Sequence, residues 1–423
     1  MYLKFYLRGN MTTEGLINQK AISNKLLQQL KQDRAWFHAH PEVAFQEFQT
    51  ASYVCNRLKK LRIPFFDRIA ETGVVAEIRG QGESNHAIGL RADMDALPMQ
   101  EKNNFSHRSV TDNAMHGCGH DGHTAILLGV AEVLAQERDF DGIVHLIFQP
   151  AEEGLAGARQ MIKEGLFKRF PMEKIFALHN WPDLPEGVIG TLKGPIMASS
   201  HYLAIKIIGR GGHGGIPHQA TPQMTIAAHI QIALNSYLAQ QTNAQRAAVI
   251  SLTRITGDEA IAVLPEMVLM EGACRLLDTQ TTKAFYRDVP RLIQSITVAF
   301  GATAEIELRE VYPVTDNQLT STDIVRKAAT NLGFTQVDES TGLYPSMASE
   351  DFSFMLQNCP GCYFWLGQGG GKNGRALHQP TYDFNDNIIE TGVATFIEIV
   401  KTALPLKPTN QINEAIHLAQ NQI

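Results

Sequence analysis

The sequence predicts an α/β protein, in which a smaller α+β domain of the ferredoxin-like type is inserted into a domain built on a mostly parallel sheet. Two observations predict this fold. In the first part of the chain, short β-rich runs alternate with helical stretches, which is typical of a parallel sheet with helices on both faces. Farther along, the expected elements follow the order β-α-β-β-α-β, which is that of a ferredoxin-like fold. We therefore expect residues 12–197 and 309–410 to form one domain and residues 198–308 to form the insert.

Each element follows from the spacing of its apolar residues. Apolar positions three or four apart predict two N-terminal helices, over 17–37 and 45–61. Short β-rich runs predict strands at 73–78, 87–90, 143–148 and 174–178, with helices at 124–135 and 158–167 between them. The insert is expected to hold strands 201–208, 247–255, 266–276 and 304–308, and helices 225–238 and 285–300. A helix at 322–332, a strand at 362–366 and a helix at 388–404 complete the first domain.

The composition is that of an ordinary globular protein. Hydrophobic residues make up 44% and charged residues 19% of the chain, which excludes a disordered or fibrous protein. The net charge of −6 leaves no basic surplus for phosphates, so we expect no binding to nucleic acid. No apolar run approaches the roughly 20 residues that a membrane span needs, so we expect no membrane association. Five thinly spread cysteines favour a reducing compartment, and we expect a cytoplasmic protein.

The first ten residues form a separate feature. They contain Lys4 and Arg8 but no continuous apolar core and no small-residue cleavage site, so we do not expect a signal peptide. Met11 opens a more typical polar start. Residues 1–10 are interpreted as an upstream start or a disordered tag.

Residues 115–123, MHGCGHDGH, form the densest cluster of metal-binding side chains. The glycines let the backbone bend, and Cys118 and His120 are separated by one residue, so both can turn toward one ion. Structural zinc sites use longer gaps and four nitrogen or sulfur ligands, so this is not a site of that kind. A single histidine here would more often cap a neighbouring helix. The cluster as a whole favours metal binding.

Two adjacent carboxylates, Glu152 and Glu153, follow the expected strand at 143–148. Consecutive side chains of an extended chain point to opposite sides, so one carboxylate can bind a metal while the other faces substrate or water. A solvated acidic loop is the alternative. The position at the carboxyl end of a strand favours function, because ligands gather there in parallel sheets.

His179 ends another expected strand, and His378 follows a glycine-rich loop. Either histidine alone would more often be structural. With the earlier candidates they make a set of five ligands: Cys118, His120, Glu153, His179 and His378. Five mixed ligands exceed what one tetrahedral ion needs, and they suit two ions about 3.5–4 Å apart that share a bridging ligand.

Two other motifs point elsewhere. Residues 209–214 fit the dinucleotide-binding pattern G-x-G-x-x-G, but Pro217 and Pro222 interrupt the helix that should follow, and residues 229–238 lack the acid that such a site needs. Cys359 and Cys362 form a C-x-x-C pair without a second pair for zinc. We interpret them as packed thiols, with a thiol-redox role as the alternative.

Eight motifs follow one another along nearly the whole chain. They are RAWFHAHPE from 34, GLRADMDALP from 89, HGCGHDGH from 116, QPAEEG from 149, LHN from 178, GRGGHGGIPH from 209, SEDF from 349 and LHQP from 377. In this order they resemble the M20 family of metallopeptidases and amidohydrolases, in its subfamily of N-acyl-L-amino-acid amidohydrolases, which includes hippurate hydrolases and auxin-conjugate hydrolases.

The resemblance implies a metal-dependent amide hydrolase with a catalytic domain and an inserted lid or dimerisation domain. It implies two divalent ions per chain, zinc or manganese with cobalt or nickel as alternatives, and Cys118 as the bridging ligand. Glu152 would be the general base, and Asp93 an acid that orients a ligand. His213 of the insert would contact the substrate or its oxyanion. The implied partners are a small N-acyl amino acid and further copies of the chain in a homodimer or homotetramer.

Three departures from the family pattern bear on substrate preference. The family's Asn before its Val-Ile-Pro loop is missing from residues 260–265, Gln379 replaces an Asn, and Gly214-Gly215 replaces Ala-Ala. A dipeptide exopeptidase and an N-acetyl-diaminopimelate deacetylase would use the same site. The alternatives outside amide hydrolysis are a non-catalytic metal-binding protein and a thiol-redox protein.

Overall fold

The computed structural model describes residues 22–243, 246–257, 260–370 and 376–406. Residues 1–10, which we interpret as an upstream start or a tag, and the first part of the helix predicted at 17–37 lie outside these ranges. Among the described residues, no helix is both long and apolar enough to cross a lipid bilayer.

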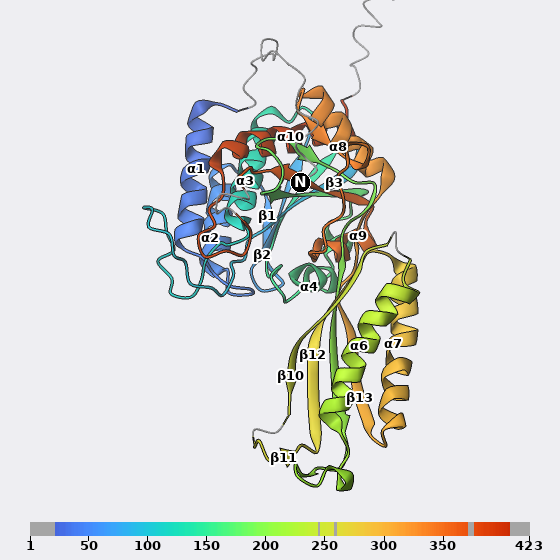
Figure 1. Ribbon diagram of the computed structural model, residues 1–423. Helices are drawn as coiled ribbons and strands as arrows, with labels where there is room; N and C mark the ends of the chain where they lie inside the picture. Colours follow the sequence, from blue (N-terminus) through green and yellow to red (C-terminus); the bar gives the residue numbers. More distant parts are fainter. Residues whose placement is uncertain (1–21, 244–245, 258–259, 371–375, 407–423) are drawn as a thin grey trace, which may run out of the picture.

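The larger part of the molecule is built on an eight-stranded sheet in the order β1-β2-β4-β3-β5-β16-β6-β15 (Figure 1). The strands are β1 (Phe65–Ile69), β2 (Gly73–Arg79), β3 (Ala87–Asp93), β4 (Ile143–Gln149), β5 (Lys174–Trp181), β6 (Ile189–Gly190), β15 (Gln336–Val337) and β16 (Gly361–Gly367). β3 runs parallel to β4 and β5, and β5 runs parallel to β16. The carboxyl ends of these four central strands therefore meet at one edge of the sheet.

Helices cover both faces of this sheet (Figure 1). One face carries α1 (Asn24–Ala39), α2 (Phe48–Lys60), α3 (His120–Glu137), α8 (Leu319–Asn331) and α10 (Ile389–Ala403). The other carries α4 (Gly157–Lys163), α5 (Leu166–Arg169) and α9 (Phe352–Asn358). Consecutive residues of a strand belong to different hydrophobic cores: Leu146 packs on the α3 side of the sheet and Ile147 on the α4 side. Because both faces are buried, these strands are continuous apolar runs, as the sequence analysis expects.

The second part is a four-stranded antiparallel sheet in the order β10-β12-β8-β13. Its elements are β8 (Ser199–Ile208), α6 (Gln223–Gln241), β10 (Ala248–Thr256), β12 (Met267–Leu276), α7 (Thr279–Ala299) and β13 (Thr303–Tyr312). The order along the chain and across the sheet is that of a ferredoxin-like fold. Both helices pack on the sheet around a separate hydrophobic core.

Short elements join and extend the two parts. β7 (Gly194–Met197) and β14 (Thr315–Asn317) pair at the root of the second sheet, where the chain enters and leaves it. β9 (Gly212–His213) and β11 (Val263–Leu264) pair at the far end, close to the 3₁₀ turn η1 (Pro217–Gln219) (Figure 1). Two further turns are η2 (Glu339–Thr341) and η4 (Asp386–Ile388). We propose that the second sheet and its helices form a separate domain, since they have a separate core.

The structure differs from the predicted elements at several places: β1 and the strands of two to four residues are absent from the prediction, and α7 begins six residues before the expected start at 285. The helix expected at 158–167 is split into α4 and α5 by Gly165, whose φ of +93° is left-handed. β13 continues to Tyr312, four residues beyond the expected boundary at 308. Helix α9 is absent from the prediction, because its seven residues are too few for a helical period to stand out.

Candidate metal centre

The candidate residues lie where the central parallel strands end. Asp93 is the last residue of β3, Glu152 and Glu153 follow the end of β4, and His179 lies two residues before the end of β5. His120 is the first residue of α3. The parallel sheet thus brings residues from four separate segments to one edge.

Gly119 allows the chain to enter α3 at the right angle. It is the N-cap of the helix and has a left-handed φ of +99°. A Cβ atom there would lie 2.3 Å from Oδ1 of Asn180 and 2.6 Å from the hydroxyl of Tyr382. Only glycine fits this position, and it places Cys118 and His120 on either side of the bend.

Five overlapping sets of donor atoms lie within 4.8 Å of one another in this region. Three of them contain the candidate ligands: Cys118 with His120 and His179, Cys118 with Glu153 and His378, and His120 with Glu152 and Glu153. The other two are Asp93 with His120 and His123, and Glu152 with Glu350 and Asp351. Sγ of Cys118 lies 3.4 Å from Nε2 of His179, and Nε2 of His378 lies 3.3 Å from Oε1 of Glu153. The structure therefore brings all five candidate ligands together, with Cys118 in two of the sets.

Among the candidate ligands, the buried histidines His120 and His179 are each oriented by a hydrogen bond at one ring nitrogen. Nδ1 of His120 lies 2.9 Å from the carbonyl oxygen of Asp95, and Nδ1 of His179 lies 2.7 Å from that of Asn180. A carbonyl only accepts, so each Nδ1 carries a proton, and in the neutral, metal-binding form of each ring the lone pair is on Nε2. Nε2 of His120 and Oε1 of Glu153 are buried without a hydrogen-bond partner among the described residues. Buried nitrogen and oxygen atoms that can offer a lone pair and have no hydrogen-bond partner are suited to bind divalent cations.

The charges of the pocket also fit cations. Burial raises the pKa of the Cys118 thiol well above its usual value, and the nearby Glu153 and Glu152 raise it further. Burial, the largest single influence, lowers the pKa of His120, but Asp93, Asp95 and Glu153 together outweigh it and raise that pKa to about 10. Burial and Glu350 raise the pKa of Glu152. Nearby carboxylates contribute to all three shifts, and a metal ion would neutralise part of this negative charge.

The two adjacent carboxylates have different surroundings, although the chain is not extended there. Ala151 has a left-handed φ of +55°, so the strand ends before the pair and simple alternation does not apply. Glu152 is only 6% exposed, and its Oε1 accepts a 3.3 Å hydrogen bond from the backbone amide of Asp351. Glu153 instead lies against Cys118 and His378. The two carboxylates thus differ in their other neighbours, although both lie in one set with His120, and the division of roles between them stays a prediction.

Asp95 supports the cluster, a role that sequence reasoning missed. Its two carboxylate oxygens accept hydrogen bonds from the backbone amides of Glu152 (3.0 Å) and Glu153 (2.8 Å). Its carbonyl oxygen accepts from His120. The only sequence signal for it is its place beside Asp93 after a buried strand.

A buried arginine lies beneath the site. Arg91 is fully buried and donates to Asp93 (2.6 Å), to Glu350 (2.9 Å) and to Asp351 (3.2 Å). Asp93 also lies 2.6 Å from Nδ1 of His123. Asp93 therefore contacts Arg91 and His123, and its Oδ2 is 3.7 Å from Nε2 of the candidate ligand His120. Sequence reasoning noted residues 349–352 only as part of the family resemblance.

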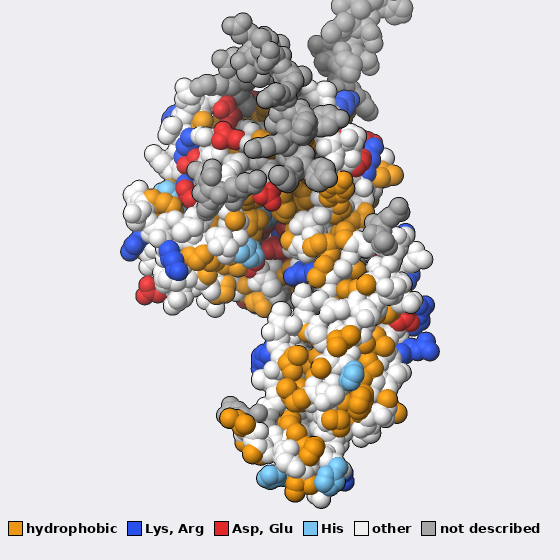
Figure 2. Space-filling model, viewed as in Figure 1, with side chains coloured by type: hydrophobic (Ala, Val, Ile, Leu, Met, Phe, Trp, Pro, Cys, Tyr) orange, Lys and Arg blue, Asp and Glu red, His pale blue; other side chains and the backbone are white. Residues whose placement is uncertain are grey.

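His213 is the one candidate that the chain does not bring to this cluster. It belongs to β9, at the far end of the second sheet (Figure 1), where Figure 2 shows histidine side chains at the surface. Its Nδ1 accepts a 3.0 Å hydrogen bond from the amide of Gly215.

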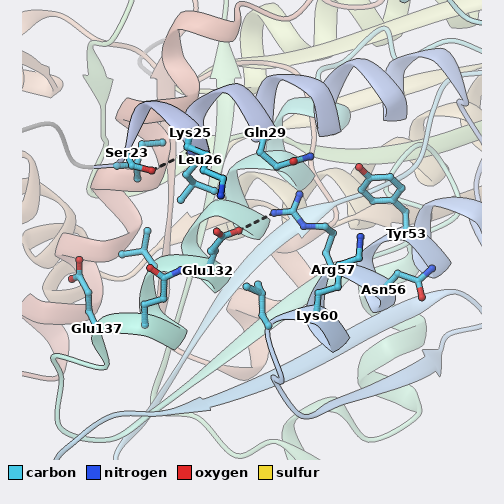
Figure 3. Close-up of a pocket in the computed structure, with 14 residues that line it drawn as sticks. Ser23, Lys25, Leu26, Gln29, Tyr53, Asn56, Arg57, Lys60, Glu132 and Glu137 are labelled. Carbon is cyan, nitrogen blue, oxygen red and sulfur yellow. Dashed lines mark hydrogen bonds and ion pairs between the residues drawn. The ribbon is translucent and has the colours of Figure 1, made fainter.

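Two other features lie outside the cluster. A hollow of about 700 Å³ between α1, α2 and α3 is lined by Tyr53, Arg57 and Glu132, and contains none of the candidate ligands (Figure 3). Cys359 and Cys362 are buried free thiols that donate to different carbonyl groups. Burial raises the pKa of each to about 12, which does not favour a redox role.

Comparisons with known proteins place the chain in a family. The model of peptidase family M20/M25/M40 matches residues 89–402. Hippurate hydrolase of Campylobacter jejuni is 36% identical over 86% of this chain and 94% of its own, and N-acetylcysteine deacetylase of Bacillus subtilis is 35% identical over 87% and 94%. A crystal structure of the B. subtilis YXEP protein, described as a dinuclear metal-binding peptidase from the M20 family, has a TM-score of 0.78 and 33% identity over 90% of this chain and 99% of that one. The chain therefore belongs to peptidase family M20/M25/M40, and it is a metal-dependent amidohydrolase.

Proposed function

We propose that this protein hydrolyses N-acyl-L-amino acids to a carboxylic acid and a free amino acid, using two divalent cations held by Cys118, His120, Glu153, His179 and His378. The observation that carries the proposal is the convergence of these five side chains beside Glu152, which is buried next to them. The names of two relatives, a hippurate hydrolase and an N-acetylcysteine deacetylase, support this class of substrate.

Glu152 is the proposed general base. The two cations would supply positive charge that acidifies water and polarises the amide carbonyl. The Glu152 carboxylate accepts a proton from the water that attacks the carbonyl carbon, and then delivers this proton to the nitrogen as the C–N bond breaks. Asp95 and the amide of Asp351 hold Glu152 in place during both transfers.

Arg275 is the proposed partner of the substrate carboxylate. It lies on β12 where the second sheet meets the first part, and its guanidinium donates to the hydroxyl of Ser349, next to Glu350. Burial lowers its pKa, yet an arginine stays charged at neutral pH. A cation at this junction suits an amino-acid product with a free carboxylate. An Arg275→Lys variant should therefore raise KM for N-acyl amino acids more than it lowers kcat.

His213 is a proposed substrate contact that a second copy of the chain would supply. Hydrophobic side chains are exposed on the helices of the second sheet, among them Ile232 and Val298, and Figure 2 shows hydrophobic patches over this part. They favour self-association in a homodimer or homotetramer. A mixture of inactive Glu152→Gln and His213→Ala chains should then regain activity, because one site in a mixed dimer is complete. A mixture that stays inactive would contradict this assignment.

A substrate panel tests the proposed function. Enzyme depleted of metal and reloaded with Zn²⁺, Mn²⁺, Co²⁺ or Ni²⁺ should hydrolyse N-acetyl, N-benzoyl or N-indoleacetyl amino acids, and chelation should abolish the activity. Dipeptides and N-acetyl-diaminopimelate are the alternative substrates of the same site. Preference for either would replace the proposed substrate class, and no hydrolysis with any metal would contradict the proposal.

A further inference from the structure

Four successive backbone amides around the proposed base each donate to a side chain. In residues 151–154, the first amide donates to Glu47 (2.9 Å) and the next two donate to Asp95 (3.0 and 2.8 Å). The fourth donates to the hydroxyl of Tyr312 (2.8 Å). Side chains from three distant segments therefore fix this loop, which has no regular secondary structure of its own.

Tyr312 differs from Glu47 and Asp95, the other two side chains that bind the loop, because it belongs to the second sheet. Glu47 is the N-cap of α2 and Asp95 follows β3, whereas Tyr312 is the last residue of β13 and pairs with Ser200 of β8. Its side chain is 5% exposed. The hydroxyl group both accepts from the amide of Gly154 and donates to the carbonyl oxygen of Glu152. The second sheet thus holds the backbone of the proposed base directly.

Contacts on both sides of the junction between the second sheet and the first part of the molecule fix the position of Tyr312. Its ring packs edge-on against Phe354 of α9, with 6.1 Å between ring centroids, while its backbone continues β13. A shift of β13 relative to β4 would therefore move the hydroxyl, and with it the peptide groups of Glu152 and Gly154. Displacements of about 1 Å at reacting groups can lower a rate about 100-fold.

We propose that Tyr312 is a positioning residue through which the second sheet fixes the place of Glu152, so that the base is aligned when the two parts have the arrangement seen here. This inference rests on the proposed function of Glu152. It assigns Tyr312 no proton transfer. Its hydroxyl acts through the backbone of the loop.

The test compares Tyr312→Phe with Tyr202→Phe in the full-length, metal-loaded protein. Tyr312→Phe keeps the ring against Phe354 and removes both hydrogen bonds. Tyr202 lies on β8 of the same sheet and donates to Glu271 (2.6 Å), away from the loop, so it is a matched control. We expect Tyr312→Phe to lower kcat about 10- to 100-fold with KM and metal content unchanged and the melting temperature only a few degrees lower, as the loss of two buried hydrogen bonds predicts, and Tyr202→Phe to leave all four unchanged.

Hydrogen–deuterium exchange gives a second readout that does not depend on catalysis. The amides of residues 151–154 should exchange about tenfold faster in Tyr312→Phe, because the loop has lost a hydrogen bond that anchors it. Unchanged exchange, or a fall in kcat matched by lost metal or by unfolding at the assay temperature, would overturn the inference. If wild-type protein hydrolyses no N-acyl amino acid, the proposed function fails, and the exchange rates still decide whether Tyr312 anchors the loop.

Discussion

Sγ of Cys118 lies 3.4 Å from Nε2 of His179, although 61 residues separate them in the sequence. A tetrahedral zinc ion holds sulfur at about 2.3 Å and imidazole nitrogen at about 2.0–2.1 Å, which places the two ligand atoms about 3.5 Å apart. The two side chains therefore have the spacing of ligands that share one ion. Cys118 also lies within reach of Glu153 and His378, as a ligand shared by two ions would.

Replacing Cys118 should remove metal from the site. In Cys118→Ser the hydroxyl does not ionise near neutral pH, so both sets of donors lose their anionic sulfur. We expect fewer than about half of the metal ions of the wild-type protein after dialysis, measured by elemental analysis, and at least a 100-fold loss of activity. Cys55→Ser, at a half-buried cysteine of α2, should keep its metal. Full occupancy in Cys118→Ser would refute the bridging role.

Replacing Glu152 should separate catalysis from metal binding. Glu152→Gln keeps the shape of the side chain but cannot accept a proton, so we expect kcat to fall by about 100- to 10,000-fold while the metal content stays that of the wild type. Glu153→Gln is the matched comparison, because the same change one residue later should lower the metal content as well. Steady-state kinetics and elemental analysis on the same samples distinguish the two, and normal turnover by Glu152→Gln would show that another group is the base.

The candidate ligands are predictable from sequence because each stands beside a strong local pattern. Glu153 and His179 adjoin apolar runs that are buried strands, and Cys118 and His120 share a glycine-rich run. A parallel sheet then brings these segments to one edge, whichever residues lie between them. The ferredoxin-like order of the second sheet is also predictable from local patterns, because its strands and helices are long enough for their periods to be recognised.

The supports of the site are not predictable in this way. Asp95, Arg91, Glu47 and Tyr312 act through contacts between segments that lie 50 to 260 residues apart. No local period or spacing marks such contacts. The place of His213 is equally hidden, because it depends on how far the second sheet extends from the first part. Local patterns therefore mark the residues with metal-binding chemistry but not those that orient them, and Asp93 is expected in that role only from the family resemblance.

The stability of the protein should fall with rising pH in a window set by His38. Burial lowers the pKa of His38, but hydrogen bonds to Asp121 (2.8 Å) and Glu101 (3.3 Å) outweigh it and raise the pKa from 6.5 to about 9. The charged form is thus favoured by folding, and its stabilisation is fully present below about pH 6.5 and is lost as the pH rises toward 9. Melting temperatures of the wild type and His38→Gln should differ most near pH 6 and converge near pH 9. A constant difference across this range would contradict the assignment.

A single added methyl group at Gly119 should disrupt the metal centre. In Gly119→Ala the Cβ atom would collide with Asn180 and Tyr382, and the residue would keep a φ of +99° that an alanine rarely adopts. Gly165→Ala is a matched control, because Gly165 is also the N-cap of a helix, has a φ of +93°, and has no atom nearer than 3.9 Å to the added group. Both variants bear the backbone strain, of about 1 kcal/mol, but only Gly119→Ala must shift Cys118 and His120. We therefore expect similar small losses of thermal stability from strain alone, with weaker metal binding by titration calorimetry only in Gly119→Ala. Equal metal affinity in the two variants would show that the close approach at Gly119 does not position the ligands.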